Sequence, residues 1–180
     1  MVFSNERFLQ NFLENEVKTG MLVVDGCAGN GQKTRFLASH VGSEGMVLSF
    51  HEEREEANKT AASLFMAGLQ DRVTVENGRL SADALRQELG RLTKVDLLLL
   101  DYSQSTAVDR HTINDECESA WPFLKDGGQL ILALPVTDNL SSIQRSVVTD
   151  FEGPFSAACF TAKDGATLLF EKESSKEETV

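Results

Sequence analysis

The amino-acid sequence predicts a single α/β domain on a doubly wound sheet that is mostly parallel and closes with a C-terminal antiparallel hairpin. Three observations predict it. Short apolar strands alternate with helical segments, a glycine-rich turn joins the first strand to the next helix, and two β-rich runs end the chain. Strands that alternate with helices pair in parallel, because each helix carries the chain back across the sheet. The 180 residues, 41% of them hydrophobic and 25% charged, suit one globular domain.

Each element has a local signal. Apolar residues recur at helical spacing in the first segment, which Ser4 can cap. Glycines precede the second and fifth strands, and acidic residues crowd the first turn of the third helix. The fourth strand contains four consecutive leucines, a run typical of a strand buried on both faces. The turn of the closing hairpin is centred on Lys163–Gly165. The elements in chain order are a helix at 4–17, a strand at 21–25, a helix at 32–41, a strand at 46–50, a helix at 52–66, a strand at 73–76, a helix at 82–92, a strand at 95–100, a helix at 115–124, a strand at 129–134, a helix at 141–151, and hairpin strands at 155–161 and 166–170.

Composition narrows the classes of function. The net charge is −11, from 17 Lys and Arg against 28 Asp and Glu, and the basic residues are scattered rather than clustered as in most nucleic-acid binders. Three distant cysteines fit no metal-ligand spacing, so we expect reduced thiols and no metal site. With no long apolar run and no leader-like start, we expect a cytoplasmic protein without a membrane partner. Residues 1–173 are predicted to form the domain, and 174–180 a disordered acidic tail.

The most informative segment is Val23–Gly31, which reads VVDGCAGNG and links the first strand to the following helix. Its glycine spacing is G-x-x-G-x-G directly after an Asp. A dinucleotide fingerprint has the reverse spacing, and a P-loop needs Lys directly after its last Gly, where this chain has Gln32. An Asp-led loop of this spacing is typical of class I S-adenosylmethionine-dependent methyltransferases, and the alternative is a simple tight turn. The residues expected to bind the cofactor here are Asp25, Gly26, Cys27, Ala28, Gly29, Asn30 and Gly31.

Polar residues also follow the later strands, at the sheet edge where such folds bind ligands. Glu52 ends the second strand and suits the ribose hydroxyls, or else is part of a charged helix start. Asn77 follows the third strand and could bond adenine or close the turn. Asp101 ends the fourth strand; it is the candidate catalytic residue, placed to orient the methionine amine or to orient or deprotonate the acceptor, or else it caps the loop.

The motif Asp25–Thr34 resembles that of a bacterial rRNA-methylase-like family, whose members methylate the aminomethyl group of a tRNA wobble uridine. Asp25, Gly29, Asn30, Gly31 and Thr34 match its pattern, and the similarity covers about two thirds of the chain, including Leu124–Gly128. The resemblance implies a Rossmann-like fold, S-adenosylmethionine as cofactor and an RNA acceptor, a tRNA or rRNA base. The chain departs from the family at four places, which are His51 where a ribose-binding Asp is expected, Gly78 where an acid follows the third strand, Asp101–Thr106 and Pro135–Asp138.

These departures leave alternatives open. His51 and Gly78 are carried over as cofactor-binding positions, although neither can supply the carboxylate of the family. The net negative charge points to a small molecule or to a partner-assisted RNA as the acceptor. Because the matched segments extend to Leu124–Gly128, the expected acceptor is RNA, with a small molecule as the alternative. A third possibility is a degenerate Rossmann-like module that acts through protein contacts without catalysis. The oligomeric state is left open, with a homodimer as one possibility.

Overall fold

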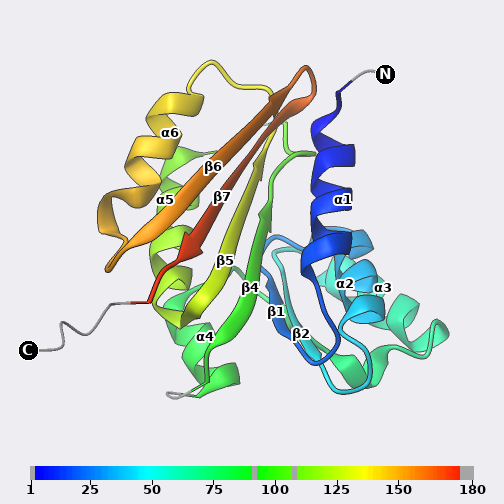
Figure 1. Cartoon of the computed structure of the whole chain (residues 1–180). Helices are drawn as coiled ribbons and strands as arrows, with labels where there is room; N and C mark the ends of the chain where they lie inside the picture. The colour runs from blue at the N-terminus through cyan, green and yellow to red at the C-terminus, as the bar shows by residue number, and fades with distance from the viewer. Residues whose placement is uncertain (1–2, 91–92, 107–108, 175–180) are drawn as a thin grey trace, which may run out of the picture.

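The computed structural model describes residues 3–90, 93–106 and 109–174. Within these ranges seven strands form one sheet in the order β3-β2-β1-β4-β5-β7-β6 (Figure 1). The strands are β1 (Leu22–Asp25), β2 (Met46–His51), β3 (Val73–Asn77), β4 (Val95–Asp101), β5 (Leu124–Leu134), β6 (Phe155–Ala162) and β7 (Gly165–Lys172). The helices are α1 (Asn5–Glu16), α2 (Gln32–His40), α3 (Arg54–Met66), α4 (Ala82–Leu89), α5 (Arg110–Ala120) and α6 (Leu140–Val147).

The sheet is doubly wound around β1. Strands β1 to β5 pair in parallel, whereas β7 runs antiparallel to both β5 and β6. The chain builds outward from β1 through β2 to β3 and then returns to place β4 on the other side of β1. The predicted fold class, with its mostly parallel sheet and C-terminal hairpin, is therefore confirmed. The strand order reverses between β1 and β4, where open α/β sheets bind their ligands.

Two layers of helices cover the two faces of the sheet, with α1, α2 and α3 on one side and α4, α5 and α6 on the other (Figure 1). The apolar strand β4 serves both layers, because successive side chains of a strand point to opposite faces. Leu97 and Leu99 are buried with residues of α1, α2 and α3, while Leu98 and Leu100 are buried with residues of α4, α5 and α6. This accounts for four consecutive leucines in one strand.

The prediction for the helix at 115–124 was wrong at its start, because α5 begins at Arg110. The side chain of Asp109 caps it by accepting a hydrogen bond from the amide of Thr112, at 3.1 Å. The first turn contains only one apolar residue, Ile113, so helical periodicity gave little signal there. A short 3₁₀ turn containing Pro122 then leads into β5 at Leu124, earlier than the predicted start at residue 129.

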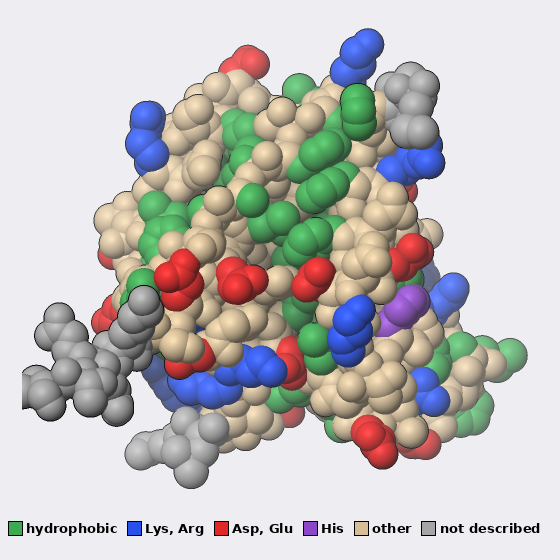
Figure 2. All heavy atoms as spheres, viewed as in Figure 1, with side chains coloured by type: hydrophobic (Ala, Val, Ile, Leu, Met, Phe, Trp, Pro, Cys, Tyr) green, Lys and Arg blue, Asp and Glu red, His purple; other side chains and the backbone are tan. Residues whose placement is uncertain are grey.

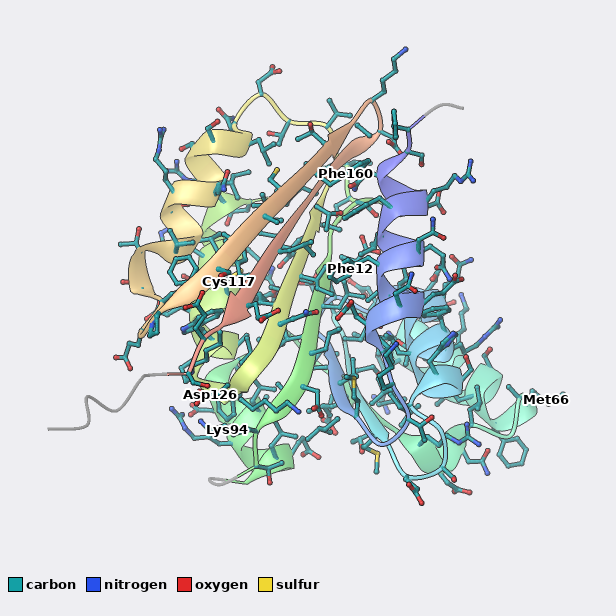
Figure 3. The ribbon with its side chains drawn as sticks, viewed as in Figure 1. Phe12, Met66, Lys94, Cys117, Asp126 and Phe160 are labelled. Atoms are coloured by element: carbon teal, nitrogen blue, oxygen red, sulfur yellow. The ribbon has the colours of Figure 1, made fainter. Side chains whose placement is uncertain are left out.

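The closing hairpin fixes α1 against the sheet. Phe8 of α1 stacks on Phe160 of β6 with ring centroids 4.2 Å apart, and apolar side chains gather along this line (Figures 2 and 3). In the hairpin turn, the Asp164 carboxylate accepts hydrogen bonds from the Asn5 amide at 2.7 Å and the Ser4 hydroxyl at 2.8 Å. The start of α1 is thereby held beside the carboxyl ends of the strands, where the cavity described below opens.

In the described ranges no helix has the length and apolar character needed to cross a membrane. Residues 175–180 of the predicted acidic tail, and residues 91–92 of the helix predicted at 82–92, lie outside those ranges. The described part of that helix ends at Leu89 and is followed by Gly90, which has a positive φ of 71°.

Candidate functional site

A cavity of about 850 Å³ opens at the carboxyl ends of β1, β2 and β4. Its size is within the usual range for small-molecule and cofactor sites. The loop after β1 forms its floor, and the segments after β2, β3 and β4 and one face of α5 form its walls. The lining residues used below are Gly26, Cys27, Ala28, Gly29, Asn30, Lys33, Glu52, Arg79, Asp101, Tyr102 and Glu116.

Backbone hydrogen bonds hold the glycine loop against neighbouring strands. The amide of Gly26 donates to the Leu99 carbonyl of β4 at 2.8 Å, and that of Ala28 donates to the Phe50 carbonyl of β2 at 2.9 Å. Gly29 and Gly31 have φ values of +48° and +75°, a backbone region that favours glycine. A side chain at Gly31 would also meet the Thr60 hydroxyl at 2.2 Å, whereas the space beside Gly29 is open. A ligand can therefore approach the backbone closely at Gly29, whereas Gly31 has no room for a side chain.

Asp25 fastens the end of β1 to α2 and does not line the cavity. It is completely buried, and one carboxylate oxygen accepts a hydrogen bond from the Thr34 hydroxyl at 2.7 Å. The other oxygen is buried and has no hydrogen-bond partner among the described residues. Burial, assisted by the nearby Asp101 carboxylate, raises the pKa of Asp25 to about 7 against the lowering effects of Thr34 and Lys33.

His51 lies behind the loop rather than in the cavity. Its Nδ1 is 2.8 Å from the Gly29 carbonyl and its Nε2 is 3.3 Å from the Ser49 hydroxyl, so both ring nitrogens are engaged. Burial lowers the pKa of His51, which favours the neutral ring. The His51 side chain thus holds the loop in place, a role for which no local sequence pattern exists.

Glu52 reaches the cavity from the end of β2, and Asn77 at the end of β3 and Gly78 after it support this segment. The Glu52 carboxylate pairs with Arg79, with 2.5 Å between Oε1 and Nε. The Asn77 side-chain amide donates to the carbonyls of His51 at 3.1 Å and Glu52 at 3.3 Å, and the Gly78 amide also donates to the His51 carbonyl. Asn77 and Gly78 are therefore placed behind Glu52 and outside the cavity lining.

Asp101 lies at the end of β4 on the opposite wall. Its Oδ1 accepts hydrogen bonds from the Ser103 hydroxyl at 2.5 Å and the Ser103 amide at 3.0 Å. Its Oδ2 is 3.8 Å from the Nζ of Lys33, which rises from the first turn of α2. Asp101 lines the cavity and also closes the turn of its own loop, as the capping alternative expected, and its catalytic role stays a prediction.

Sequence reasoning missed a buried polar cluster on the α5 wall of the cavity. Glu116 has a side chain only 8% exposed, and its Oε2 accepts a hydrogen bond from the Tyr102 hydroxyl and lies 3.4 Å from the Cys27 sulfur. Its Oε1 lies 3.6 Å from the Nε of Arg79. Burial raises the pKa of Glu116 and, together with the adjacent carboxylate, the pKa of the Cys27 thiol. No local pattern marks Glu116, because the surrounding helix is rich in acids that face solvent.

No protein-family model matches the sequence. Solved structures do match its fold, and an rRNA methylase from Streptococcus thermophilus has a TM-score of 0.73 at 18% identity, covering 97% of this chain and 99% of that one. This chain has the fold of S-adenosylmethionine-dependent methyltransferases. An O-methyltransferase of that type from Thermotoga maritima has a TM-score of 0.69 at 24% identity, over 99% of this chain and 68% of the other. A Bacillus cereus O-methyltransferase in complex with S-adenosylhomocysteine has a TM-score of 0.68 at 21% identity, over 94% and 82%.

Within this methyltransferase fold the cavity occupies the switch point between β1 and β4. The predicted site residues divide into two groups. One group lines the cavity and consists of Gly26, Cys27, Ala28, Gly29, Asn30, Glu52 and Asp101. The other lies directly behind that lining and consists of Asp25, Gly31, His51, Asn77 and Gly78.

Proposed function

We propose that this protein is a methyltransferase that uses S-adenosylmethionine. The observation that carries the proposal is that the glycine loop at the start of α2 and the carboxylate of Glu52 at the end of β2 line one cavity. A glycine loop whose backbone a ligand can approach closely suits the methionine end of the cofactor. A carboxylate that accepts two hydrogen bonds suits the vicinal hydroxyls of its ribose.

The residues present fit that cofactor in size and in charge. The space beside Gly29 is open, so backbone can be approached closely there. The cofactor bears a sulfonium and an ammonium group, and the cavity lining holds more carboxylates than cations. We assign the loop Gly26–Asn30 to the methionine part and Glu52 to the ribose. Asp25 and His51 act from behind, by holding the loop through Thr34 and Gly29.

We assign to Asp101 the task of orienting the acceptor and taking its proton. When bound, the cofactor supplies an electrophilic methyl carbon, so the protein has to position the nucleophile and remove one proton. The Ser103 hydroxyl and amide hold Asp101 Oδ1 in a fixed orientation. Oδ2 faces Lys33 across 3.8 Å, which leaves it accessible to an acceptor. Asp101→Asn is expected to abolish methyl transfer while cofactor binding is kept within about threefold.

For the acceptor we place a small neutral or cationic molecule ahead of RNA. Four acidic side chains, those of Glu6, Glu53, Glu56 and Asp109, also line the cavity, while its two cations, Lys33 and Arg79, are engaged with carboxylates. A polyanion would meet repulsion at this rim. RNA is the second candidate, supported by the similarity to the Streptococcus thermophilus rRNA methylase over 97% of this chain.

Calorimetric titration with S-adenosylmethionine, S-adenosylhomocysteine, NAD and ATP tests the cofactor. We expect the first two to bind and the other two not to bind. Tighter binding of NAD would refute the methyltransferase assignment. If none of the four binds, the module that acts through protein contacts becomes the better description.

Transfer of labelled methyl onto total tRNA, rRNA and a small-metabolite extract, each at low salt, tests the acceptor. We expect label in the metabolite fraction, and its loss with Asp101→Asn. Label confined to tRNA or rRNA would overturn our order of preference and support the RNA candidate.

A further inference from the structure

The Glu116 carboxylate and the Tyr102 hydroxyl, in the polar cluster on the α5 wall, have no task in the function proposed so far. The cluster joins the carboxylate of Glu116, the Tyr102 hydroxyl, the Cys27 thiol and the Arg79 guanidinium, and all four side chains belong to residues that line the cavity. A carboxylate buried to this degree costs free energy unless it is paired or used. The two carboxylate oxygens of Glu116 have different contacts within the protein.

Oε2 of Glu116 is occupied on the protein side, because the Tyr102 hydroxyl donates to it and the Cys27 thiol approaches it at 3.4 Å. Oε1 accepts no hydrogen bond from the described protein atoms, and the Nε of Arg79 lies 3.6 Å from it. The arrangement fixes the carboxylate by one oxygen and leaves the other oxygen as an acceptor. This oxygen can accept a hydrogen bond from an N–H group of a ligand.

Arg79 indicates which part of the cofactor would meet this oxygen. One guanidinium nitrogen, Nε, faces both Glu52 Oε1 at 2.5 Å and Glu116 Oε1 at 3.6 Å. Glu116 is therefore the next carboxylate along the cavity wall from the one assigned to the ribose. The group attached to that ribose is adenine, and its 6-amino group is a donor. Asn77, the residue expected to bond adenine, instead donates its side-chain amide to the carbonyls of His51 and Glu52.

We propose that Glu116 recognises the 6-amino group of the cofactor's adenine, with Tyr102 as the residue that orients it. The proposal rests on the proposed function, since it assigns a specificity residue within the same site. Its carboxylate comes from the middle of α5 and not from a strand end. The site would thus reject a purine that presents a carbonyl oxygen at the 6-position, because two acceptors would face each other in a buried place.

The experiment compares S-adenosylhomocysteine with S-inosylhomocysteine, in which a carbonyl oxygen replaces the amino group. Calorimetric titration of the parent protein is expected to give tenfold to hundredfold tighter binding of the adenine form. In Glu116→Gln the preference is expected to fall to within about threefold, because the Gln amide can turn its NH₂ toward the carbonyl while its oxygen still accepts from Tyr102. Glu118→Gln, an exposed position on the same helix, should keep the parent's preference.

Equal binding of the two ligands by the parent would overturn the proposal and leave the proposed function standing, and this result needs no variant. A full preference retained by Glu116→Gln would also overturn it, since a merely structural Glu116 would not affect the choice of base. Failure of the parent to bind S-adenosylhomocysteine would instead refute the proposed function on which the inference rests. Thermal denaturation of both variants confirms that they are folded when binding is measured.

Discussion

Asp25→Asn is expected to make the folded protein more stable, and increasingly so as the pH rises. Asp25 is completely buried, and one of its oxygens has no hydrogen-bond partner among the described residues. An Asn side chain has nearly the same shape and can still accept the hydrogen bond from Thr34. The substitution therefore removes a buried charge and leaves the packing in place.

The magnitude follows from the pKa of Asp25. Burial raises this pKa from its ordinary value of 3.8 to about 7. The folded state therefore holds its proton where the unfolded state has lost it, so this group destabilises the fold progressively as the pH rises from about 4 to 7. A shift of roughly three pKa units corresponds to about 4 kcal/mol of unfolding free energy above pH 7. Of this, about 3 kcal/mol develops between pH 5 and pH 8.

Urea denaturation of the parent and the variant at pH 5 and pH 8 measures the effect. The stability gap in favour of Asp25→Asn should widen by about 3 kcal/mol between the two pH values. Asp138→Asn, at an exposed position, serves as the control and should show no widening. A gap that stays constant, or that closes as the pH rises, would refute the argument that burial holds the proton on Asp25.

Three further predictions concern the loop and its supports. Asp25→Ala also removes the acceptor for the Thr34 hydroxyl, and we expect tenfold to hundredfold weaker binding of S-adenosylhomocysteine by calorimetry. Burial lowers the pKa of His51 below its usual 6.5, so as the pH falls the unfolded state takes up a proton before the folded state does. The unfolding free energy of the parent should therefore decrease as the pH falls below 6.5. In urea denaturation, His51→Gln should lack this decrease. Gly31→Ala should lower the unfolding free energy by at least about 2 kcal/mol, because Gly31 has a φ of +75° and lies against Thr60. Gly29→Ala, beside open space, should lower it by about 1 kcal/mol, and thermal denaturation of both variants measures the difference.

The features predicted correctly from the sequence are those determined by interactions between residues close together in the chain. Alternating apolar strands and helices suffice for the parallel sheet, and the four consecutive leucines of β4 indicated a strand buried on both faces. The start of α5 was missed because a capping Asp109 and a single apolar Ile113 leave almost no periodic signal. The glycine loop could be located because φ values such as that of Gly31 require glycine in a fixed place.

The walls of the site were harder to predict because tertiary packing decides them. Glu116 looks like one more surface acid in the sequence, and only the packing of α5 beside Cys27 and Tyr102 buries it. His51 illustrates the same limit, since its role depends on the distance to the Gly29 carbonyl across a loop. Local patterns reveal which strand ends carry polar residues, but not which of two adjacent residues faces the cavity.

At the end of β2, two consecutive residues have different roles: His51 holds the glycine loop, and Glu52 lines the cavity. Side chains alternate along a strand, so His51 lies on the same face as Ser49, to which its Nε2 is bonded. Glu52, the first residue beyond the strand, turns into the cavity instead. A carboxylate at position 51 could not hold the Gly29 carbonyl, because an ionised carboxylate only accepts hydrogen bonds. A histidine that donates to Gly29, next to an acid that lines the cavity, therefore allows the same strand end to hold the loop and to present a carboxylate to the cavity. A loop fixed in this way loses less conformational entropy when a ligand is bound.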